Sequence, residues 1–308
     1  MKPSIIEFLQ KENIAPAILR GIQEFRSQYP RPPEAEVSQA QPHYHYYGKN
    51  IWEQAATAIL CGKNLLLCGA KATGKNVLAE NLAAAFDRPR WNVSLHINMD
   101  ASFMVGTDTF AEGRVSFRPG PVYQCAQKGG FCILDEINMA RNEALAVLHS
   151  LLDYRRMMDI PGYDLLELHP ATRFIATMNY GYAGTRELNE ALASRFVVLR
   201  LPVICGDDLI TLLQSEYPTL RPAAAAQLAG MFTDLQKKCA SGEISSRALD
   251  LRGLLDAIGL MHYGLPPAEA LAMGITNKVF DEYEPTLIQD IISLRLPAKL
   301  ERHQLFTD

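Results

Sequence analysis

One stretch, Leu65 to Ala85, constrains the fold more than any other part of the sequence. It reads LLLCGAKATGKNVLAENLAAA, so an apolar segment typical of a strand runs into a loop framed by Gly69 and Gly74 and then into an amphipathic helix that starts at Lys75. The spacing G-x-x-x-x-G-K lets successive backbone N–H groups turn toward a phosphate, and the lysine reaches the terminal phosphates. The positive end of the helix dipole points at the same place. The stretch therefore predicts a nucleotide site in an α/β fold.

The expected nucleotide contacts are the residues of this loop and of the first helical turn. They are Gly69, Ala70, Lys71, Ala72, Thr73, Gly74, Lys75, Asn76 and Val77. Asn76 stands where Ser or Thr usually offers a hydroxyl to Mg²⁺; its amide oxygen is also a hard ligand, but it extends one bond further from the backbone. We expect ATP and Mg²⁺ as cofactors, with Asn76 as a metal ligand and metal binding as the least regular part of the site.

Composition limits the class of protein. The chain has 308 residues, 48% of them hydrophobic, which is enough for one large domain or two ordinary ones. A net charge of −4 and a pI near 6.0 give no general attraction to nucleic acid or to anionic lipid, and no apolar run is long enough to span a bilayer. The polar N-terminus is unlike a signal peptide, and six scattered cysteines without a C-x-x-C pair favour reduced thiols over disulfides or zinc. These features predict a cytoplasmic protein.

A second chemical feature follows the apolar run Phe131–Leu134. This run reads as a strand buried on both faces, so Asp135 and Glu136 would emerge at its carboxyl end, where open α/β sheets bind ligands. Asp135 would hold Mg²⁺ or a water on it, and Glu136 would polarise the water that attacks the γ-phosphate. The alternative is an acidic pair that only caps the next helix; the phosphate loop upstream favours the catalytic interpretation.

Two further polar residues stand at the ends of predicted elements. Asn179 ends the buried strand 173–179 and is suited to orient the attacking water, although Asn at a strand end is commonly just a turn residue. Arg195 lies between the helix 188–194 and the strand 196–201. It could neutralise transition-state charge on a neighbouring subunit's nucleotide, or simply pair with a carboxylate.

The rest of the first two thirds of the chain alternates helices and strands. We expect two short helices in residues 4–28, divided by Pro16, a proline-rich linker over 30–42, and helices over 49–60, 121–128 and 143–153. We expect strands over 91–97, a hairpin over 105–120 with Glu112 and Gly113 at its turn, and a second hairpin around Pro161 and Gly162. Tyr47 could border an adenine pocket. His43 and His45 could share a metal, but surface or stacking roles are commoner and no third ligand is near.

From Ile204 onward the pattern is helical only, which predicts a small α-helical lid domain. Arg247, near the start of its third helix, could reach the γ-phosphate, and Arg252 is the rival for this role; the alternative for both is a charge on a solvent-facing helix. The predicted domains are an N-terminal extension with linker over residues 1–44, a nucleotide-binding α/β domain over 45–203, and the lid with a C-terminal tail over 204–308.

Taken in order, these pieces resemble the AAA+ ATPases, specifically the MoxR-like branch that includes the CbbQ, NorQ and GvpN groups. The resemblance spans roughly residues 45 to 260 and rests on GAKATGKN, on GTDTFAEGRVSFRPGPVYQCAQKGG leading into FCILDEINMAR, and on HSLLDYRR, RFIATMNYGYAG, LNEALASRF and SSRALDLR. It implies a parallel sheet flanked by helices and followed by an all-α lid. The resemblance makes Lys75 the phosphate lysine, Asp135 and Glu136 the metal-side and catalytic acids, Asn179 the first sensor, Arg195 the trans-acting finger and Arg247 the second sensor. Asn76, and Lys71 where a proline is common, depart from the pattern.

The resemblance also implies a hexameric ring that couples ATP hydrolysis to the remodelling of a client protein, often with a partner bearing a von Willebrand factor A domain, and commonly for metal insertion into a metalloenzyme. Two other functions stay open at this point. One is a nucleic-acid motor or loader that grips a strand through Arg114, Phe117 and Arg118 of the hairpin, against which the acidic charge counts. The other is a scaffold that binds ATP and barely hydrolyses it, as Asn76 suggests.

Overall fold

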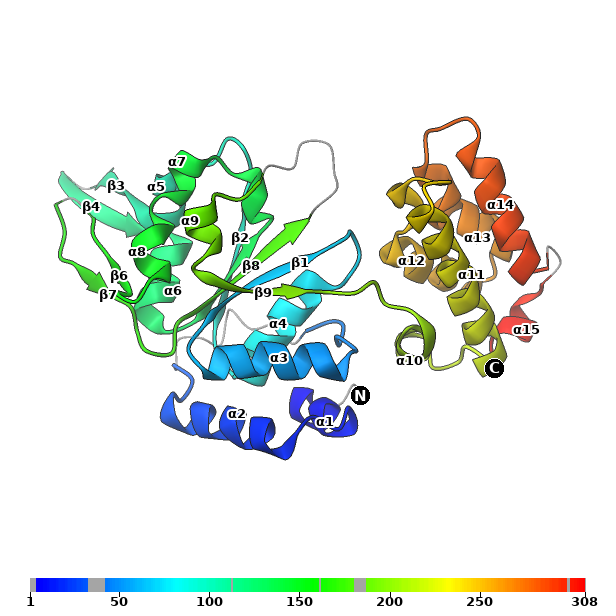
Figure 1. Ribbon diagram of the computed structural model, residues 1–308, viewed down its shortest axis with the longest axis horizontal. Helices are drawn as coiled ribbons and strands as arrows, with labels where there is room; N and C mark the ends of the chain where they lie inside the picture. Colours follow the sequence, from blue (N-terminus) through cyan, green and yellow to red (C-terminus); the bar gives the residue numbers. More distant parts are fainter. Residues whose placement is uncertain are drawn as a thin grey trace. The chain divides into compact units, whose positions relative to one another are not determined.

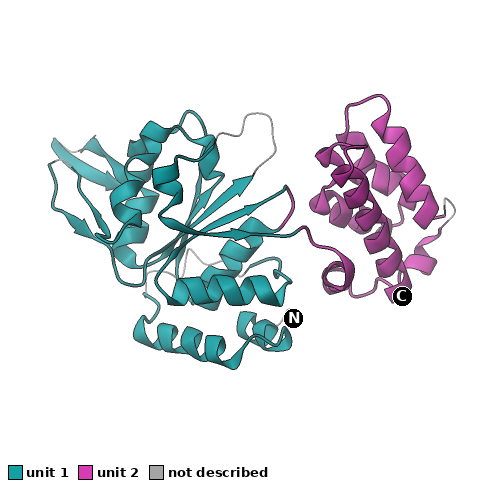
Figure 2. Cartoon of the chain, viewed as in Figure 1, with its two compact units in different colours: residues 1–70, 74–202 teal, residues 71–73, 203–308 magenta. Residues whose placement is uncertain are grey.

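A computed structural model of the chain describes residues 4–32, 42–111, 113–160, 162–179, 187–297 and 300–307. The chain forms two compact units, the first made of residues 1–70 and 74–202, the second of residues 71–73 and 203–308 (Figure 2). Most of the predicted linker, Glu112 and Pro161 of the two predicted hairpin turns, and the segment 180–186 lie outside the described residues.

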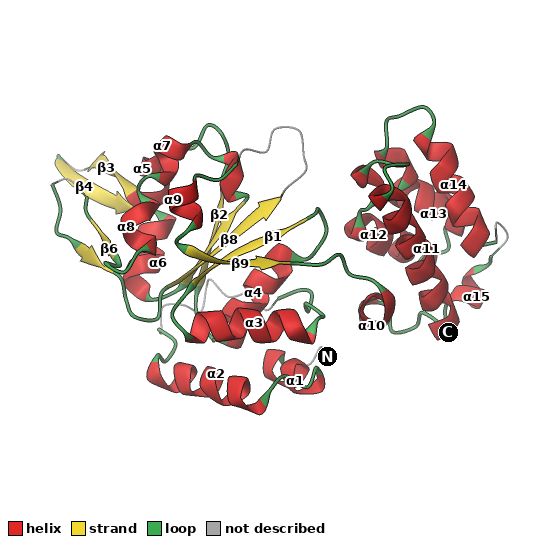
Figure 3. Cartoon of the chain, in the orientation of Figure 1, coloured by secondary structure: helices red, strands yellow, loops and turns green. Residues whose placement is uncertain are grey.

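The first unit contains a five-stranded parallel sheet with the order β2-β5-β8-β1-β9 (Figure 3). Its strands are β1 Asn64–Gly69, β2 Arg90–Ser94, β5 Phe131–Asp135, β8 Arg173–Asn179 and β9 Phe196–Arg200. The three inner strands are nearly continuous apolar runs, because helices cover both of their faces. This is the parallel sheet that the sequence predicts.

Alternate residues of the inner strands enter two separate cores. Leu65 and Leu67 of β1 pack with α1 to α4, whereas Leu66 and Cys68 pack with the helices α5 to α8. Figure 1 shows α3 and α4 on one side of the sheet and α6, α8 and α9 on the other. The helices of the first unit, in chain order, are α1 Ile5–Lys11, α2 Pro16–Gln28, α3 Lys49–Leu60, α4 Lys75–Ala85, α5 Ala101–Val105, α6 Pro121–Lys128, α7 Asn142–Leu145, α8 Leu148–Leu152 and α9 Glu190–Ala193.

The two N-terminal helices are part of this packing. Pro16 occupies the first turn of α2, where its missing N–H costs no helical hydrogen bond, so it separates the two helices as predicted. Ser4 and Glu7 form a capping box at the start of α1. Phe8 of α1 and Ile22 of α2 are buried in the same core as α3 and α4.

Two small antiparallel hairpins complete the first unit. The first pairs β3 Gly106–Ala111 with β4 Arg114–Pro119, and the second pairs β6 Met157–Met158 with β7 Leu166–Glu167. Phe117 of β4 packs on Tyr163, with a ring-centroid distance of 4.8 Å, and the Tyr163 hydroxyl donates to the Asp108 carboxylate. The base of the first hairpin therefore rests on the loop of the second.

Two predictions about elements of this unit are wrong. The strand expected over 91–97 ends at Ser94, because its partner β5 ends at the paired residue Asp135. The helix expected over 143–153 is two short helices, α7 and α8. Ala146 and Val147 between them keep near-helical dihedral angles, so the interruption is a loss of regular hydrogen bonding and not a reversal of the chain.

The second unit is entirely helical in its described residues apart from one isolated bridge, Leu220 with Phe306. It contains α10 Gly206–Glu216, α11 Pro222–Ala240, α12 Leu251–His262, α13 Pro267–Gly274, α14 Glu284–Arg295 and α15 Arg302–Leu305, with two 3₁₀ turns, Ser246–Ala248 and Thr276–Lys278. The expected third helix starts only at Leu251, where the Asp250 side chain caps it. Among the described residues of the chain, no helix combines the length and apolar character needed to cross a membrane.

Helices α12 and α13 approach so closely that each needs a glycine at the contact. A Cβ atom on Gly253 would lie 1.9 Å from the Gly274 carbonyl oxygen, and one on Gly274 would lie 2.2 Å from the Gly253 carbonyl oxygen. The backbones therefore touch directly.

Candidate nucleotide site

The loop between β1 and α4 has the backbone that the glycine spacing predicts. Gly74 adopts φ 79°, a left-handed conformation that side chains disfavour, and Ala72 adopts φ 63°. A Cβ atom on Gly74 would also lie 3.1 Å from the Tyr46 ring. Position 74 therefore needs glycine both for its dihedral angles and for the space that the tyrosine leaves.

Lys75, the first residue of α4, lies folded over this loop. Its Nζ donates to the Ala70 carbonyl at 2.7 Å and to the Gly69 carbonyl at 3.1 Å, and the residue is only 8% exposed. Burial lowers the pKa of Lys75 to about 8, and the nearby Asp135 carboxylate partly opposes this shift. Lys75 is thus held at the loop, where a bound phosphate would stabilise its protonated form.

Asp135 joins the phosphate loop to the middle of the sheet. Its Oδ2 accepts a hydrogen bond from the Asn76 amide at 3.0 Å, and its Oδ1 accepts one from the Thr177 hydroxyl at 2.5 Å. Asn76 comes from the helix that follows the loop, and Thr177 from β8. Residues from three separate parts of the sequence therefore meet at one carboxylate.

Glu136 lies beside this carboxylate with an unusual backbone. It adopts φ 55° and ψ 48°, the left-handed region that few residues other than glycine occupy. Its side chain is exposed, and Oε1 accepts a hydrogen bond from the Asn179 amide at 2.9 Å. The Asn179 carbonyl in turn accepts one from the buried Asn138 side chain at 3.0 Å. The predicted acid and the predicted sensor are thus in direct contact.

The residues present fit a magnesium ion. Mg²⁺ is held in phosphate-binding sites by one or two protein oxygens, with substrate phosphates and waters completing its shell. Asp135 supplies a carboxylate, and Asn76, in contact with it, carries an amide oxygen that rotation about one bond would present. The amide nitrogen, not the oxygen, faces Asp135 in this structure, so metal binding by Asn76 stays a prediction.

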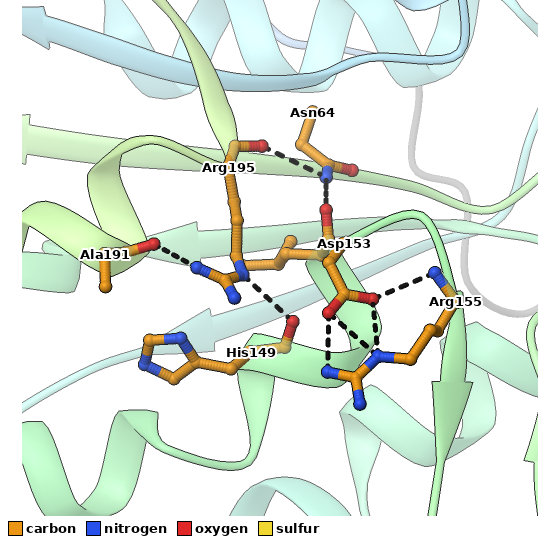
Figure 4. A network of polar contacts seen from close by, with 7 residues as sticks. Asn64, His149, Asp153, Arg155, Ala191 and Arg195 are labelled. Atoms are coloured by element: carbon orange, nitrogen blue, oxygen red, sulfur yellow. Dashed lines mark hydrogen bonds and ion pairs between the residues drawn. The ribbon is translucent and has the colours of Figure 1, made fainter.

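Arg195 lies near the end of β1 that is opposite the phosphate loop. Figure 4 shows its polar contacts. Arg195 precedes β9, and Asn64, the first residue of β1, donates to its carbonyl at 3.5 Å. Gly69 is five residues further along β1, which corresponds to about 17 Å of strand. The Arg195 guanidinium donates to the carbonyls of His149, at 3.1 Å, and of Ala191. Arg195 therefore cannot reach the phosphate loop of its own chain.

The surroundings of Arg195 also test the alternative that it only pairs with a carboxylate of its own chain. The nearby Asp153 carboxylate is bound by Arg155, whose Nη2 lies 2.7 Å from Oδ2. This hydrogen bond is the main cause that lowers the pKa of Asp153, and Arg195 contributes least. Among the described residues, Arg195 makes no ion pair with a carboxylate, so a structural salt bridge does not account for it.

The roles predicted for Tyr47, at an adenine pocket, and for Arg247 or Arg252, as the second sensor, stay predictions. Tyr47 is half-buried and meets the Phe8 ring edge-on at 5.3 Å, while His45 stacks on Phe8 at 4.3 Å, which agrees with the stacking alternative for this histidine. Arg247 is exposed in the second unit, with its Cζ 5.7 Å from the Phe280 ring, and Arg252 is exposed in α12.

Among the described residues, no group of three or more His, Cys, Asp or Glu side chains is arranged to hold a metal ion. All six cysteines have free thiols, as the sequence predicts.

Comparison with known proteins places this site in a family. The sequence matches the AAA domain, dynein-related subfamily, over residues 64–196. It is 34% identical over 253 residues to the Bacillus subtilis protein described as "Uncharacterized protein YojN", covering 80% of this chain and 83% of that one. The chain belongs to the AAA domain family.

Two further relatives of this AAA domain protein come from staphylococci. A Staphylococcus haemolyticus protein, SH1500, is 32% identical over 252 residues, which cover 80% of this chain and 95% of that one. A Staphylococcus aureus protein, SAUSA300_1302, is 33% identical over 258 residues, which cover 82% and 98%. The similarity therefore extends beyond the AAA match itself, and the family supports an AAA+ ATPase in general terms.

The AAA match begins with β1 and ends at the first residue of β9. It contains the loop lysine, the two acids, Asn179 and Arg195, whereas Tyr47, Arg247 and Arg252 lie outside it. The sequence prediction missed two residues of the site, Thr177 and Asn138. Thr177 could have been found, because it stands two positions before Asn179 in a strand and so shares its face.

Proposed function

We propose that this AAA domain protein binds ATP with Mg²⁺ and hydrolyses the nucleotide in a ring of identical subunits, as a MoxR-type ATPase that remodels or activates a client protein. One observation carries the enzymatic part. One continuous set of hydrogen bonds joins Asn76 of α4, Asp135 at the end of β5, the next residue Glu136, and Asn179 at the end of β8. The Thr177 hydroxyl provides its link between the two acids. Residues that are far apart in sequence are thus assembled beside the loop.

Each of these groups suits a step of phosphoryl transfer to water. The loop amides and Lys75 would bind the phosphates, and Asp135 with Asn76 would hold Mg²⁺, which neutralises charge on them. Glu136 would take the proton of the attacking water, and Asn179, already hydrogen-bonded to that carboxylate, would orient the water.

The position of Arg195 favours assembly into a ring. An arginine about 17 Å from its own phosphate loop can serve catalysis only at the site of another subunit. Repetition of one such head-to-tail contact gives a ring when its rotation closes on itself. A hexamer is the proposed assembly, because it is the one that the MoxR resemblance implies.

The exposed end of the β3–β4 hairpin favours a protein client. Phe110 and Val115, which face each other across the two strands, are 76% and 65% exposed, while Phe117 on the same face is covered by Tyr163 at the base. Bare apolar side chains of this kind suit contact with an apolar protein segment. A von Willebrand factor A domain partner, metal insertion into the client and a cytoplasmic location belong to the same proposal.

The geometry of the same hairpin disfavours the alternative function as a nucleic-acid motor or loader. Strand alternation places Arg114 and Arg118 on one face and Phe117 on the other, so the three residues cannot grip a strand together. Phe117 is also occupied by Tyr123 and Tyr163, at ring-centroid distances of 5.2 Å and 4.8 Å.

The test separates nucleotide binding from hydrolysis. Lys75→Ala should lose ATP affinity, because it removes the buried charge at the loop, whereas Glu136→Gln should keep the affinity and lose phosphate release. Equilibrium binding of a fluorescent ATP analogue and a phosphate-release assay measure the two quantities. Wild-type protein that binds ATP tightly without turnover would support the scaffold instead, and equal loss of binding in both variants would contradict the assigned roles.

Mixed subunits test the proposed assembly. Arg195→Ala and Glu136→Gln proteins should each be inactive and should recover part of the activity when mixed, because some interfaces then combine an intact finger with an intact acid. A wild-type protein that stays monomeric with ATP and Mg²⁺ and hydrolyses at full rate would rule out the ring.

A further inference from the structure

The backbone pairing of β5 with β8 stops just before the catalytic acids. The last paired residues are Leu134 and Ala176. One residue further along, the link between the strands passes from the backbone to a side chain, the hydroxyl of Thr177. Both acids of the proposed reaction therefore lie beyond the end of the β5–β8 pairing, although Asp135 is still paired with Ser94 of β2.

One hydroxyl holds both of these acids. Thr177 Oγ1 donates to Asp135 Oδ1 at 2.5 Å and accepts the backbone N–H of Glu136 at 3.0 Å. Thr177 is completely buried, so water cannot take the place of the hydroxyl without opening the sheet. The first bond fixes the direction of the Asp135 carboxylate, and the second fixes the peptide group that leads into Glu136.

Glu136 needs such a constraint. Its left-handed backbone is a conformation that a residue other than glycine keeps only when its surroundings enforce it. The N–H bond to Thr177 lies at one end of the residue, and its carbonyl accepts the Met139 N–H at 2.8 Å at the other. With the backbone held at both ends, the Glu136 side chain starts from a fixed position and accepts the hydrogen bond of the Asn179 amide.

We propose that Thr177 is a positioning residue that sets Asp135 for the metal ion and Glu136 for the attacking water through its single hydroxyl. The expected effect of Thr177 on turnover rests on the proposed ATPase function. The expected effect of Thr177 on Mg²⁺ affinity does not, because it requires only that the protein binds nucleotide. Thr177 would touch neither substrate nor metal; it acts through the two acids.

The chain offers a matched control for the loss of a buried hydroxyl. Thr172, immediately before β8, is also completely buried, and its hydroxyl donates to the carbonyls of Cys125 at 3.4 Å and Ala126 at 3.2 Å, not to either acid. Thr172→Val and Thr177→Val remove the same group from similar surroundings. A purely structural role predicts the same outcome for both.

The experiment compares Thr177→Val, Thr177→Ser and Thr172→Val with wild type in three measurements. These are the affinity for a fluorescent ATP analogue in EDTA, the Mg²⁺ concentration that gives half of the metal-dependent change in that affinity, and the turnover number. We expect Thr177→Val to raise the Mg²⁺ requirement about tenfold or more, as for other residues that orient a metal ligand. We expect turnover to fall about 10- to 100-fold, since a misplaced catalytic group costs this much. Affinity in EDTA should change less than about threefold, because the loop and Lys75 are untouched.

The controls decide between positioning and stability. Thr177→Ser keeps the hydroxyl and should stay within about threefold of wild type in all three measurements, and Thr172→Val should lower the melting temperature and leave them unchanged. The proposal is overturned if Thr177→Val keeps the wild-type Mg²⁺ requirement, if serine fails to rescue, or if Thr172→Val gives the same defects.

Two further outcomes are also decisive. If Thr177→Val does not fold, Thr177→Ala replaces it, and failure of both to fold assigns the hydroxyl to stability and overturns the proposal. Wild-type protein without turnover refutes the proposed ATPase, while the Mg²⁺ requirement for binding still tests Thr177.

Discussion

The affinity for ATP should fall in alkaline solution because of Lys75. In the nucleotide-free protein, burial places the pKa of this lysine near 8, so it loses its proton well below the usual range for lysine. A bound triphosphate favours the charged form and raises this pKa, so binding above pH 8 requires the uptake of a proton. If only the charged lysine binds, the dissociation constant rises about tenfold between pH 7 and pH 9, as the charged fraction falls from roughly nine tenths to one tenth.

The stability of the nucleotide-free protein should move in the opposite direction. Between about pH 8 and pH 10.5 the unfolded chain still carries the Lys75 proton while the folded chain does not. Because the unfolded state then binds more protons, this group makes the free energy of unfolding rise with pH in that window. General alkaline damage would instead lower affinity and stability together.

Titration calorimetry at pH 7, 8 and 9 measures the first effect, and urea unfolding without nucleotide measures the second. The matched control is Lys75→Arg, whose guanidinium stays charged throughout, so its affinity should depend on pH only through the nucleotide itself. An unchanged wild-type dissociation constant from pH 7 to pH 9, or the same fall in Lys75→Arg, would refute the reasoning.

Two further predictions concern single positions. Asn76→Thr should lower the Mg²⁺ requirement and raise turnover with little change in ATP affinity, because a hydroxyl close to the backbone reaches the ion more directly than the amide; an unchanged Mg²⁺ dependence would show that asparagine is a competent ligand. Gly253→Ala should destabilise the helical unit by about 3 kcal/mol in thermal unfolding, since its Cβ would lie 1.9 Å from the Gly274 carbonyl. The control is Gly230→Ala in α11, where the nearest atom to the new Cβ would be 3.6 Å away. This substitution should stabilise the protein by about 0.5–1 kcal/mol, because alanine favours a helix more than glycine does. Equal effects of the two substitutions would contradict the close contact of α12 with α13.

The local parts of the site could be predicted from sequence because each is encoded by neighbouring residues. The strand, loop and helix around Lys75 carry their own signals in glycine spacing and apolar pattern, and Asp135 follows a short apolar run typical of a buried strand. Apolar patterning also predicted the parallel sheet, because it reports burial on both faces.

What could not be predicted depends on which strands become neighbours. The contacts of Thr177 with Asp135 and Glu136 exist because β8 lies beside β5, an order that local patterns do not encode. The same is true of Arg195, whose distance from the phosphate loop follows from β9 pairing with β1. The break between α7 and α8 had no breaker residue to announce it, since Ala146 and Val147 are compatible with a helix.

The left-handed backbone at Glu136 makes this glutamate costly for the stability of the fold. Glycine would adopt φ 55° with less strain, by about 1 kcal/mol, so Glu136→Gly removes a carboxylate and at the same time relieves a cost to the fold. A sequence chosen for stability alone would have no reason to keep glutamate there. The strain at Glu136 agrees with the catalytic role proposed for its carboxylate, and a screen for more stable variants would favour glycine at this position.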